Sequence, residues 1–564
     1  MKDMIDSAHH EDGAVSSEAA SLPEKAPVVD LDDEEGYLKI LRERPVKMFS
    51  GPRIRLYATC VIIYLCSTMN GFDGSLMTSI NTMQEYIDYF HLSGSATGTG
   101  IIFSIYQIGQ ISATVFIWLA DYIGRVRTIF AGCVLVCVGA IISATCDQIH
   151  TFIGARFLLS FGCGLATAVC PMYLVEITPP ELRGNLSAMY NSFYYVGSII
   201  ATWSIYGTSI SHKGSELSFK IPLWLQLLCP GMVVVGVLFL APESPRFNYL
   251  KDKKQATRDF FVKYHADGDD THPLVDYEMA QVEISFLELP KFGIRDYFDF
   301  PKLFTTKSRA YRSLLVIAWS WFGQYSGNAV VGYYMTTIFL DLGITNATTR
   351  LLLNAVNSIL GLVFAASGSL LVDRVGRRFM MIYATSGFIL SFTVIAACIA
   401  AFENNGNQVA GRAGIAFIYI FNNVFFSFGY TPLQPLYPAE ILSSEMRARG
   451  MALFQLTQGV ASFVNTFAAP TAMENIRYWF YVFYVFWDCI ELVVIYFFFV
   501  ETKRLTLEEI ESLFEGSSPV KTSIKVAKHH DEQAKFRKQQ AKDEKKAAAE
   551  TLANLQNAVI DNAA

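Results

Sequence analysis

Charged residues are scarce in this chain of 564 residues. They make up 17% of it, against about 25% in an average soluble domain, whereas hydrophobic residues make up 52%. The apolar residues are gathered in long runs, such as 129–146 and 480–500. Because a helix needs about 20 apolar residues to cross the hydrocarbon core of a bilayer, these runs have the right length. The composition excludes a set of ordinary soluble domains and indicates a membrane protein with many spans.

Other features are missing as well. The formal net charge of −6 shows no basic excess, so we expect no nucleic-acid partner. The ten cysteines fall in or beside apolar runs without paired spacing in a polar loop, which predicts neither a disulfide framework nor a metal site. The polar, acidic start of the chain lacks the basic and apolar regions of a signal peptide, so insertion would rely on the first internal hydrophobic segment. No phosphate-binding GxxxxGK[ST] loop and no catalytic constellation is present, and we expect no enzyme and no cofactor.

The hydrophobic pattern predicts an all-α membrane protein with twelve transmembrane helices in two six-helix halves. Five parts follow: a polar tail (1–55), a first bundle (56–242), a charged linker with short helices (243–312), a second bundle (313–502) and a polar tail (503–564). The expected spans lie near 56–80, 98–120, 129–146, 151–174, 190–210, 222–241, 313–340, 352–372, 379–402, 413–438, 451–472 and 479–500.

Basic residues in the short loops predict the orientation. An even number of spans places both tails and the linker on one side of the membrane. The short loops of that side hold eight arginines, and those of the other side hold five basic residues. The linker adds twelve more basic residues to the first side. Since Lys and Arg accumulate in cytoplasmic loops, both tails are expected in the cytoplasm.

Three charged motifs occur twice in the same order, once in each half. The matched segments are Asp121–Arg125 with Asp373–Arg377, Glu176–Arg183 with Glu440–Arg447, and Glu243–Arg246 with Glu501–Lys503, at offsets of 252, 264 and 258 residues. Such ordered repetition predicts a tandem duplication of a six-helix unit. Parallel halves with a substrate held between them near the midplane are the architecture of the major facilitator transporters.

These motifs resemble the sugar porter family of the major facilitator superfamily over roughly 56–510. The family pattern has D-x-x-G-R-[RK] twice, an E…R pair after spans 4 and 10, P-E-S-P-R after span 6 and [PV]-E-T-K after span 12, with small departures here at Val126, Phe247 and Ser443. Charged side chains at helix ends can bridge neighbouring helices and bias two packings of the halves, whereas a lone charge is more often a simple anchor. The candidate gating ion pairs are Asp121, Arg125, Glu176, Arg183, Glu243, Arg246, Asp373, Arg377, Glu440, Arg447 and Glu501.

A narrower resemblance is to the fungal lactose permeases. It is carried by Asn70–Met77, Tyr264–Pro273, Trp321–Asn328 and Asn475–Val485. The related cellodextrin transporters share the YHxxGDxxHP stretch within Tyr264–Pro273 and the SGNA sequence at 326–329. The resemblance implies proton-coupled uptake of a disaccharide, such as lactose, a related galactoside or cellobiose, at the cell membrane by a protein that acts as a monomer.

Asp73 lies inside the first span. A carboxylate there costs about 2.5–3.5 kcal/mol on insertion scales, which makes it a functional candidate. Arg156 in span 4 matches the family arginine that pairs with it. We expect the paired Asp73 to be ionised and to take a proton when the pair separates, which would couple proton and sugar fluxes. The alternative is a static buried pair.

The central sugar site follows from family positions. Planar amides suit the hydroxyl groups of a sugar and aromatic rings suit its faces. At five family positions the usual larger Gln, Asn or Trp is replaced, by Asn191, Gly323, Ala329, Pro435 and Ser462, and we interpret this as a pocket widened for a second ring. The alternative is loss of sugar binding with the fold retained. The candidate substrate-binding residues are Asn191, Gln324, Asn328, Asn357, Asn465 and Tyr333.

Three further features leave alternatives open. Asp488 and Glu491 lie one turn apart in the middle of span 12, either as a second proton site or as buried polar groups bonded to neighbours. Asn346 begins a glycosylation sequon in a loop expected outside the cell. The same scaffold could also serve a sugar sensor with little flux, an exporter of a fungal metabolite or a proton-independent facilitator.

Overall fold

The computed structural model describes residues 40, 41, 43–92, 96–287, 299–443, 446–503, 505, 507–516, 518–530 and 532. Most of the two expected tails therefore lies outside the described residues. Within the described ranges, some side chains are also outside the description, among them those of Arg183, Tyr333, Asp373 and Arg447. The roles expected for these four side chains stay predictions.

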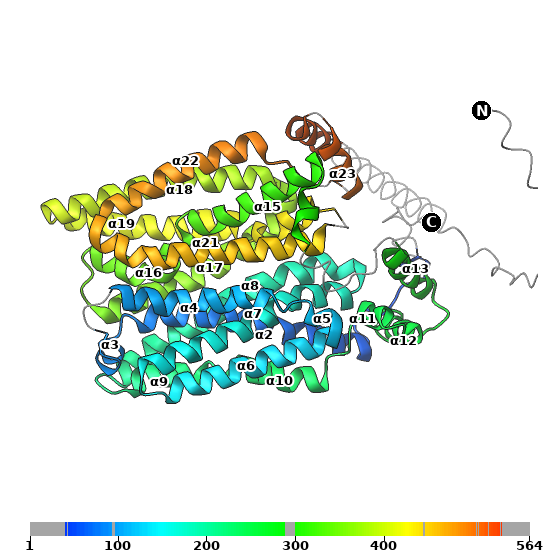
Figure 1. The fold of residues 1–564 in the computed structure, drawn as a ribbon, viewed down its shortest axis with the longest axis horizontal. Helices are drawn as coiled ribbons and strands as arrows, with labels where there is room; N and C mark the ends of the chain where they lie inside the picture. Colours follow the sequence, from blue (N-terminus) through cyan, green and yellow to red (C-terminus); the bar gives the residue numbers. More distant parts are fainter. Residues whose placement is uncertain are drawn as a thin grey trace, which may run out of the picture.

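The first half of the chain forms a bundle of long helices that run roughly parallel or antiparallel to one another (Figure 1). Two of its rods are broken, between α4 and α5 and between α9 and α10. The helices are α2 (Gly51–Ile80), α4 (Ala96–Thr114), α5 (Leu119–Ile123), α6 (Arg125–Thr145), α7 (Ile149–Ile177), α8 (Pro180–Ser211), α9 (Leu217–Leu225) and α10 (Leu228–Phe239), with the short α3 (Gln84–Tyr89) after α2.

The second half forms a similar bundle beside the first (Figure 1). One rod is broken between α15 and α16, and another joins α19, the π-helix η2 and α20. The helices are α15 (Lys307–Tyr325), α16 (Asn328–Asp341), α17 (Ala347–Val375), α18 (Arg377–Asn405), α19 (Gln408–Tyr419), η2 (Ile420–Tyr430), α20 (Leu433–Ile441), α21 (Arg447–Ile476) and α22 (Tyr478–Phe498). With broken rods counted once, the described residues form twelve long rods in two groups of six.

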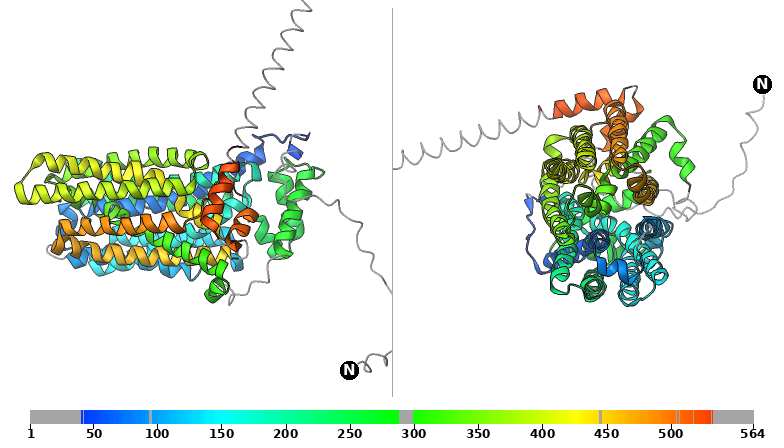
Figure 2. Two further views of the ribbon diagram at one scale, coloured as in Figure 1. Left: turned by 90° about the horizontal axis from the view of Figure 1, so that it is seen from above. Right: turned by 90° about the vertical axis from the view of Figure 1, so that its left-hand side faces the viewer.

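Short helices gather at one end of the bundles, beyond the long helices (Figure 2). We call this the linker end, and the opposite end, where α2 stops at Ile80 and α18 stops at Asn405, the far end. The short helices of the linker end are α11 (Pro245–Leu250), α12 (Lys254–Tyr264), α13 (Pro273–Leu287), the 3-10 helix η1 (Phe300–Phe304) and α23 (Leu507–Glu515).

Seven helical segments of the described residues are long and apolar enough to cross a membrane. They are Arg125–Thr145, Ile149–Ile177, Leu217–Phe239, Ala347–Val372, Arg377–Asn404, Gln408–Ile441 and Tyr478–Phe498. The other five rods are those of α2, α4, α8, α15 with α16, and α21. Each of them contacts the opposite half: α4 contacts α21, α8 contacts α17 and α2 contacts α16. Side chains at such an interface can be polar without facing lipid, which is why composition alone marks fewer spans than the twelve rods.

Glycines let α2 and α8 approach closely within the first bundle. A Cβ atom at Gly71 would overlap the backbone of Tyr194, and one at Gly197 would overlap the carbonyl of Thr68. Small residues that bring two backbones together are typical of helix pairs in membranes, where packing replaces the hydrophobic effect as the driving force.

One histidine of the linker holds the linker helices to the first bundle, and a second holds them to the segment before α2. His265 donates from Nε2 to the carbonyl of Ile177 at the end of α7 (3.1 Å), and its Nδ1 lies 2.6 Å from a carboxylate oxygen of Glu278 in α13. Arg53 donates to the carbonyl of His265 at 3.0 Å. His272 donates to the carbonyl of Arg44 at 3.2 Å. The YHxxGDxxHP stretch is therefore a structural clasp between α12, α13 and the membrane helices.

Candidate functional site

The buried acid of α2 is paired. Asp73 forms a direct ion pair with Arg156 of α7, and the two side chains are only 1% and 2% exposed. Gln226, at the break between α9 and α10, donates from Nε2 to the same carboxylate oxygen at 2.5 Å. The guanidinium lies over the ring of Tyr106, 5.2 Å from its centroid. Three segments of the first half therefore meet at one carboxylate.

This arrangement leaves one hydrogen-bonding atom of each partner in the ion pair unused. Among the described residues, Asp73 Oδ2 and Arg156 Nε are buried and have no hydrogen-bond partner. A buried ion pair is stable only as a pair, because removal of one partner leaves a buried charge that costs about 3–5 kcal/mol. The pair can thus separate only if one member changes its charge or gains another partner. Gln226 was not predicted from the sequence, although an amide inside an apolar run was a signal that could have marked it.

Two of the expected sugar ligands lie on either side of the break between α15 and α16. The backbone turns at Gly327, which has a φ of +83°, a conformation that favours glycine. Gln324 and Asn328 flank this turn, are half-buried and, among the described residues, make no side-chain hydrogen bond. Their amides are free to bind a ligand.

Two other expected ligands are engaged by the protein itself. Asn465 of α21 donates to the carbonyl of Gln324 at 2.7 Å and accepts from the hydroxyl of Tyr484 at 2.6 Å. Asn357 of α17 accepts from Asn423 of η2 at 2.8 Å. The geometry gives both residues a structural task, holding the α15 break and the π-helix in place.

Asn191 joins the two halves. It donates to the carbonyl of Thr431 between η2 and α20 at 3.0 Å. One turn further along α8, the hydroxyl of Tyr195 lies 2.7 Å from that of Ser427. A Cβ atom at Gly361 would overlap the ring of Tyr195, so a glycine is needed there for this ring to fit between the halves. Tyr195 was missed in the sequence, where it is one of several tyrosines in the span.

The remaining hydrogen bonds between the halves lie toward the far end. Ser198 donates to Ser358 at 3.0 Å, and Asn354 donates to Ser79 at 3.0 Å. Thr78 donates to the carbonyl of Gly332 at 2.9 Å. Among the described residues, no hydrogen bond between the halves lies nearer to the linker end than that of Asn191. The halves are therefore held together from the middle to the far end.

A charged cluster closes the linker end of the first half. Arg125 at the start of α6 donates to both carboxylate oxygens of Glu176 in α7 (3.0 and 3.1 Å) and lies 2.8 Å from Asp121. The hydroxyl of Ser244 also donates to Glu176. Glu243 accepts from the backbone N–H of Arg125 at 3.0 Å, and burial raises its pKa above the ordinary value of a glutamate.

The second half repeats this cluster. Arg377 at the start of α18 donates to both carboxylate oxygens of Glu440 in α20 (2.7 and 3.2 Å), and Thr502 donates to Glu440 at 2.6 Å. Glu501 accepts from the backbone N–H of Arg377 at 2.9 Å. Beyond the motifs seen in the sequence, the duplication includes Ser244 with Thr502. It also includes Tyr173 with Tyr437, whose hydroxyls donate to the carbonyls of Pro242 and Val500.

Each cluster lies within its own half. The ion pairs join neighbouring helices of one bundle, and the described part of the chain contains no ion pair that links the two clusters. Arg246, also expected in the first cluster, is exposed and forms no ion pair with the described residues. Asn346 accepts from the backbone N–H groups of Thr348 and Thr349 and thereby caps the start of α17.

Asp488 and Glu491 are fully buried in α22. The indole of Trp487 donates to Glu491 at 2.5 Å. Among the described residues, both oxygens of Asp488 lack a hydrogen-bond partner. The structure thus supports the bonded interpretation for Glu491. For Asp488 the described residues provide no hydrogen bond that would support it.

The widened pocket expected from smaller residues is not what the structure contains at three of the five positions. Ala329 and Ser462 are 3% and 4% exposed, so neighbouring side chains already surround them. A Cβ atom at Gly323 would overlap the amide of Gln434 from α20. Neighbours fill these spaces, because helices close around smaller side chains.

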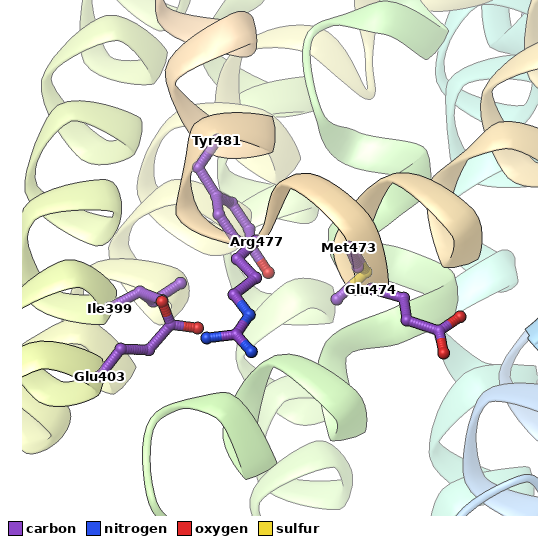
Figure 3. A pocket seen from close by; sticks show the side chains of 6 residues that line it. All are labelled: Ile399, Glu403, Met473, Glu474, Arg477 and Tyr481. Carbon is purple, nitrogen blue, oxygen red and sulfur yellow. The ribbon is translucent and has the colours of Figure 1, made fainter.

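A small pocket at the far end is separate from these residues. It lies between α18, α21 and α22 and is lined by Ile399, Glu403, Met473, Glu474, Arg477 and Tyr481 (Figure 3). In the close view the Arg477 guanidinium points toward the carboxylate of Glu403. Its polar lining comes from helix ends and a tight connection, in which Arg477 has a φ of +47°.

Comparison with known proteins gives a consistent picture. The family described as "Sugar (and other) transporter" matches residues 59–514. The hexose transporter HXT13 of Saccharomyces cerevisiae is 27% identical over 492 residues, which cover 83% of this chain and 84% of that protein. The MFS-type transporter oryC of Aspergillus oryzae is 26% identical over 471 residues (82% and 86%). The quinate permease of Neurospora terricola is 25% identical over 493 residues (84% and 91%).

Solved structures share the fold. The inward-open conformation of the xylose transporter XylE from Escherichia coli superimposes with a TM-score of 0.65 at 18% identity, covering 81% of this chain and 99% of that one. XylE bound to 6-bromo-6-deoxy-D-glucose, described as a proton:xylose symporter, gives a TM-score of 0.66 at 20% identity with the same coverage. The all-α major facilitator fold is thereby confirmed.

Proposed function

The chain belongs to the family of sugar (and other) transporters, and we propose that within this family it imports a disaccharide together with a proton across the plasma membrane. It is a transporter and not an enzyme. The observation that carries the proton part is the buried site of Asp73, Arg156 and Gln226 in the first half.

The proton acts at the Asp73 carboxylate. The Arg156 guanidinium is in contact with the Asp73 carboxylate and balances its negative charge. Protonation of Asp73 removes the attraction and frees Arg156 to move with α7. Re-formation of the pair expels the proton on the other side of the membrane. The membrane potential adds about 2.3 kcal/mol per charge per 100 mV to this inward movement.

The sugar binds where the halves meet beside the α15 break. Gln324 and Asn328 offer amides whose donors and acceptors match sugar hydroxyl groups. Asn191 reaches the same interface from the first half, and binding of a sugar there would compete with its bond to Thr431. Tyr333 follows Asn328 on α16 and is proposed to provide a ring face. The disaccharide itself rests on the resemblance to fungal lactose permeases.

In alternating access, the two charged clusters keep the linker end of each half rigid. Arg125 with Glu176, and Arg377 with Glu440, hold the helix ends of each half together, so that each half moves as a unit. Bonds between the halves from Asn191 to the far end correspond to a state closed on that side. We assign the linker end and both tails to the cytoplasm, which makes this an inward-facing state.

A second candidate is a permease for a polyhydroxylated acid, because quinate permeases are among the relatives. The free amides at Gln324 and Asn328 would suit either ligand. A sugar sensor, an exporter and a proton-independent facilitator are separated from the proposal by flux and by its dependence on protons.

The test is uptake by cells that lack disaccharide transport. Labelled lactose, cellobiose, glucose and quinate are offered at acidic and at alkaline external pH, with and without a protonophore. We expect disaccharide entry that is stronger in acid and abolished by the protonophore. Entry of quinate alone would establish the second candidate. Absence of any entry, with the protein at the cell surface, would overturn the transport proposal in favour of a sensor or exporter.

A further inference from the structure

The sugar-site helix α15 lacks a side chain at Gly323, and another helix fills the space. A Cβ atom built at Gly323 would overlap both the nitrogen and the oxygen of the Gln434 amide. Gln434 belongs to α20, more than a hundred residues further along the chain. Its amide therefore occupies the position that a side chain of residue 323 would take.

The register of α15 against α20 makes this placement specific. The indole of Trp319, one turn before Gly323, donates to the carbonyl of Leu433 at 3.3 Å. The Trp319 ring also lies 4.7 Å from the ring of Tyr430, at the end of η2. Because these two contacts fix both helices, the residue after Leu433 faces Gly323.

The Gln434 amide has no partner in the protein. Among the described residues, its Nε2 and Oε1 are both buried and form no hydrogen bond. A buried polar group left unpaired destabilises the protein, so an amide kept in such a place is expected to serve a ligand that satisfies it. Gly323 presents no side chain at this point, so the Gln434 amide lies close to the backbone of α15, one residue before Gln324 in the chain.

We propose that Gln434 is a sugar-binding residue that supplies, from α20, the amide absent at Gly323 of α15. The inference rests on the proposed function, since it adds a binding residue to the same sugar site. Its N–H donates to one sugar hydroxyl and its carbonyl accepts from a neighbouring one, beside the amide of Gln324.

The test is sugar binding to the purified full-length protein, measured by calorimetry with lactose and cellobiose. Gln434→Met keeps the length of the side chain and removes the amide, and we expect at least a tenfold loss of affinity. Gly323→Gln alone introduces a side chain that overlaps Gln434, and binding is also expected to fall. The double variant Gly323→Gln with Gln434→Ala moves the amide to α15 and should return affinity to within about threefold of the wild type.

Gln408→Ala, an exposed glutamine at the start of α19, is the matched control and should bind like the wild type. Thermal unfolding of every variant shows that it is folded. If the wild type binds no sugar, the proposed function fails. If the wild type binds and Gln434→Met binds equally well, this inference alone is overturned. It is also overturned if the double variant stays as weak as Gln434→Met, since Gln434 would then act through packing.

Discussion

Gln226 and Arg156 donate to the same carboxylate oxygen of Asp73, Arg156 from α7 and Gln226 from the break between α9 and α10. Gln226 lies between α9 and α10, where the rod is interrupted, so a change at Asp73 is transmitted both to α7 and to this break. Discontinuous helices at the midplane are recurrent in transporters for this kind of contact. The relationship ties the charge of one carboxylate to three elements of the first half.

Replacement of Gln226 by Leu is expected to lower proton-driven uptake at every external pH. The substitution removes a buried hydrogen bond to Asp73 Oδ1 and places an apolar side chain beside the ion pair with Arg156. The measurement is initial uptake rate against external pH, with Gln148→Leu, an exposed glutamine before α7, as control. An unchanged profile would show that Gln226 has no influence on proton-driven uptake.

Asp73→Asn is expected to abolish accumulation against a gradient while sugar still exchanges across the membrane. The neutral amide resembles the protonated acid and cannot release a proton. Asp73→Asn leaves Arg156 without its counter-charge, and Arg156→Ala leaves Asp73 without its own. Each substitution is expected to cost about 3–5 kcal/mol of stability. The double variant Asp73→Asn with Arg156→Ala should recover part of this loss. Accumulation in vesicles and thermal unfolding are measured together, with Asp252→Asn at an exposed turn as control. Proton-driven accumulation by Asp73→Asn would contradict the coupling role.

Glu243→Gln is expected to flatten the dependence of stability on pH. Burial raises the pKa of Glu243 in the folded protein above its unfolded value, so the folded state binds the proton more tightly. Its contribution to stability is then present at low pH and is lost as the pH rises from the unfolded toward the folded pKa. Melting temperatures of wild type and variant across this window should converge in acid and diverge above it, with the variant more stable. A wild type that gains stability relative to the variant as pH rises would show that the backbone hydrogen bonds outweigh burial.

His265→Phe is expected to loosen the linker helices from the first bundle. The substitution removes the bond to Ile177 and the contact with Glu278, both buried, and unpaired partners cost about 1–3 kcal/mol each. Limited proteolysis should cut α12 and α13 faster, and the melting temperature should fall. His150→Phe, at an exposed position, provides the comparison. Equal protease resistance in both variants would mean that the clasp is not held by this histidine.

Much of the architecture was predictable because it depends on local pattern. Apolar runs predicted the long helices, and matched offsets predicted the duplication that the two clusters at Arg125 and Arg377 display atom by atom. The helix breaks were harder. Gly327 and the amide at Gln226 were visible in the sequence, but whether a helix bends at such a residue depends on what packs beside it.

The candidate sugar site, which is rich in amides, could likewise be predicted only in part. Gln324, Asn328, Asn357 and Asn465 were all candidates of one kind, yet only the first two keep free side chains in the described structure. Hydrogen-bond partners such as Tyr484 and Asn423 come from other helices, and their positions cannot be counted along the chain.

By itself, the sequence determined the class of the protein, its two matched halves, the residues of its charged clusters and the acid in the first span. Each of these depends on composition, on spacing or on the cost of burying a charge. Only the tertiary structure decided which amides are free, that Gln226 shares Asp73 with Arg156, and that Gln434 fills the space left by Gly323. These are contacts between helices far apart in the chain, and they depend on the register in which whole helices pack.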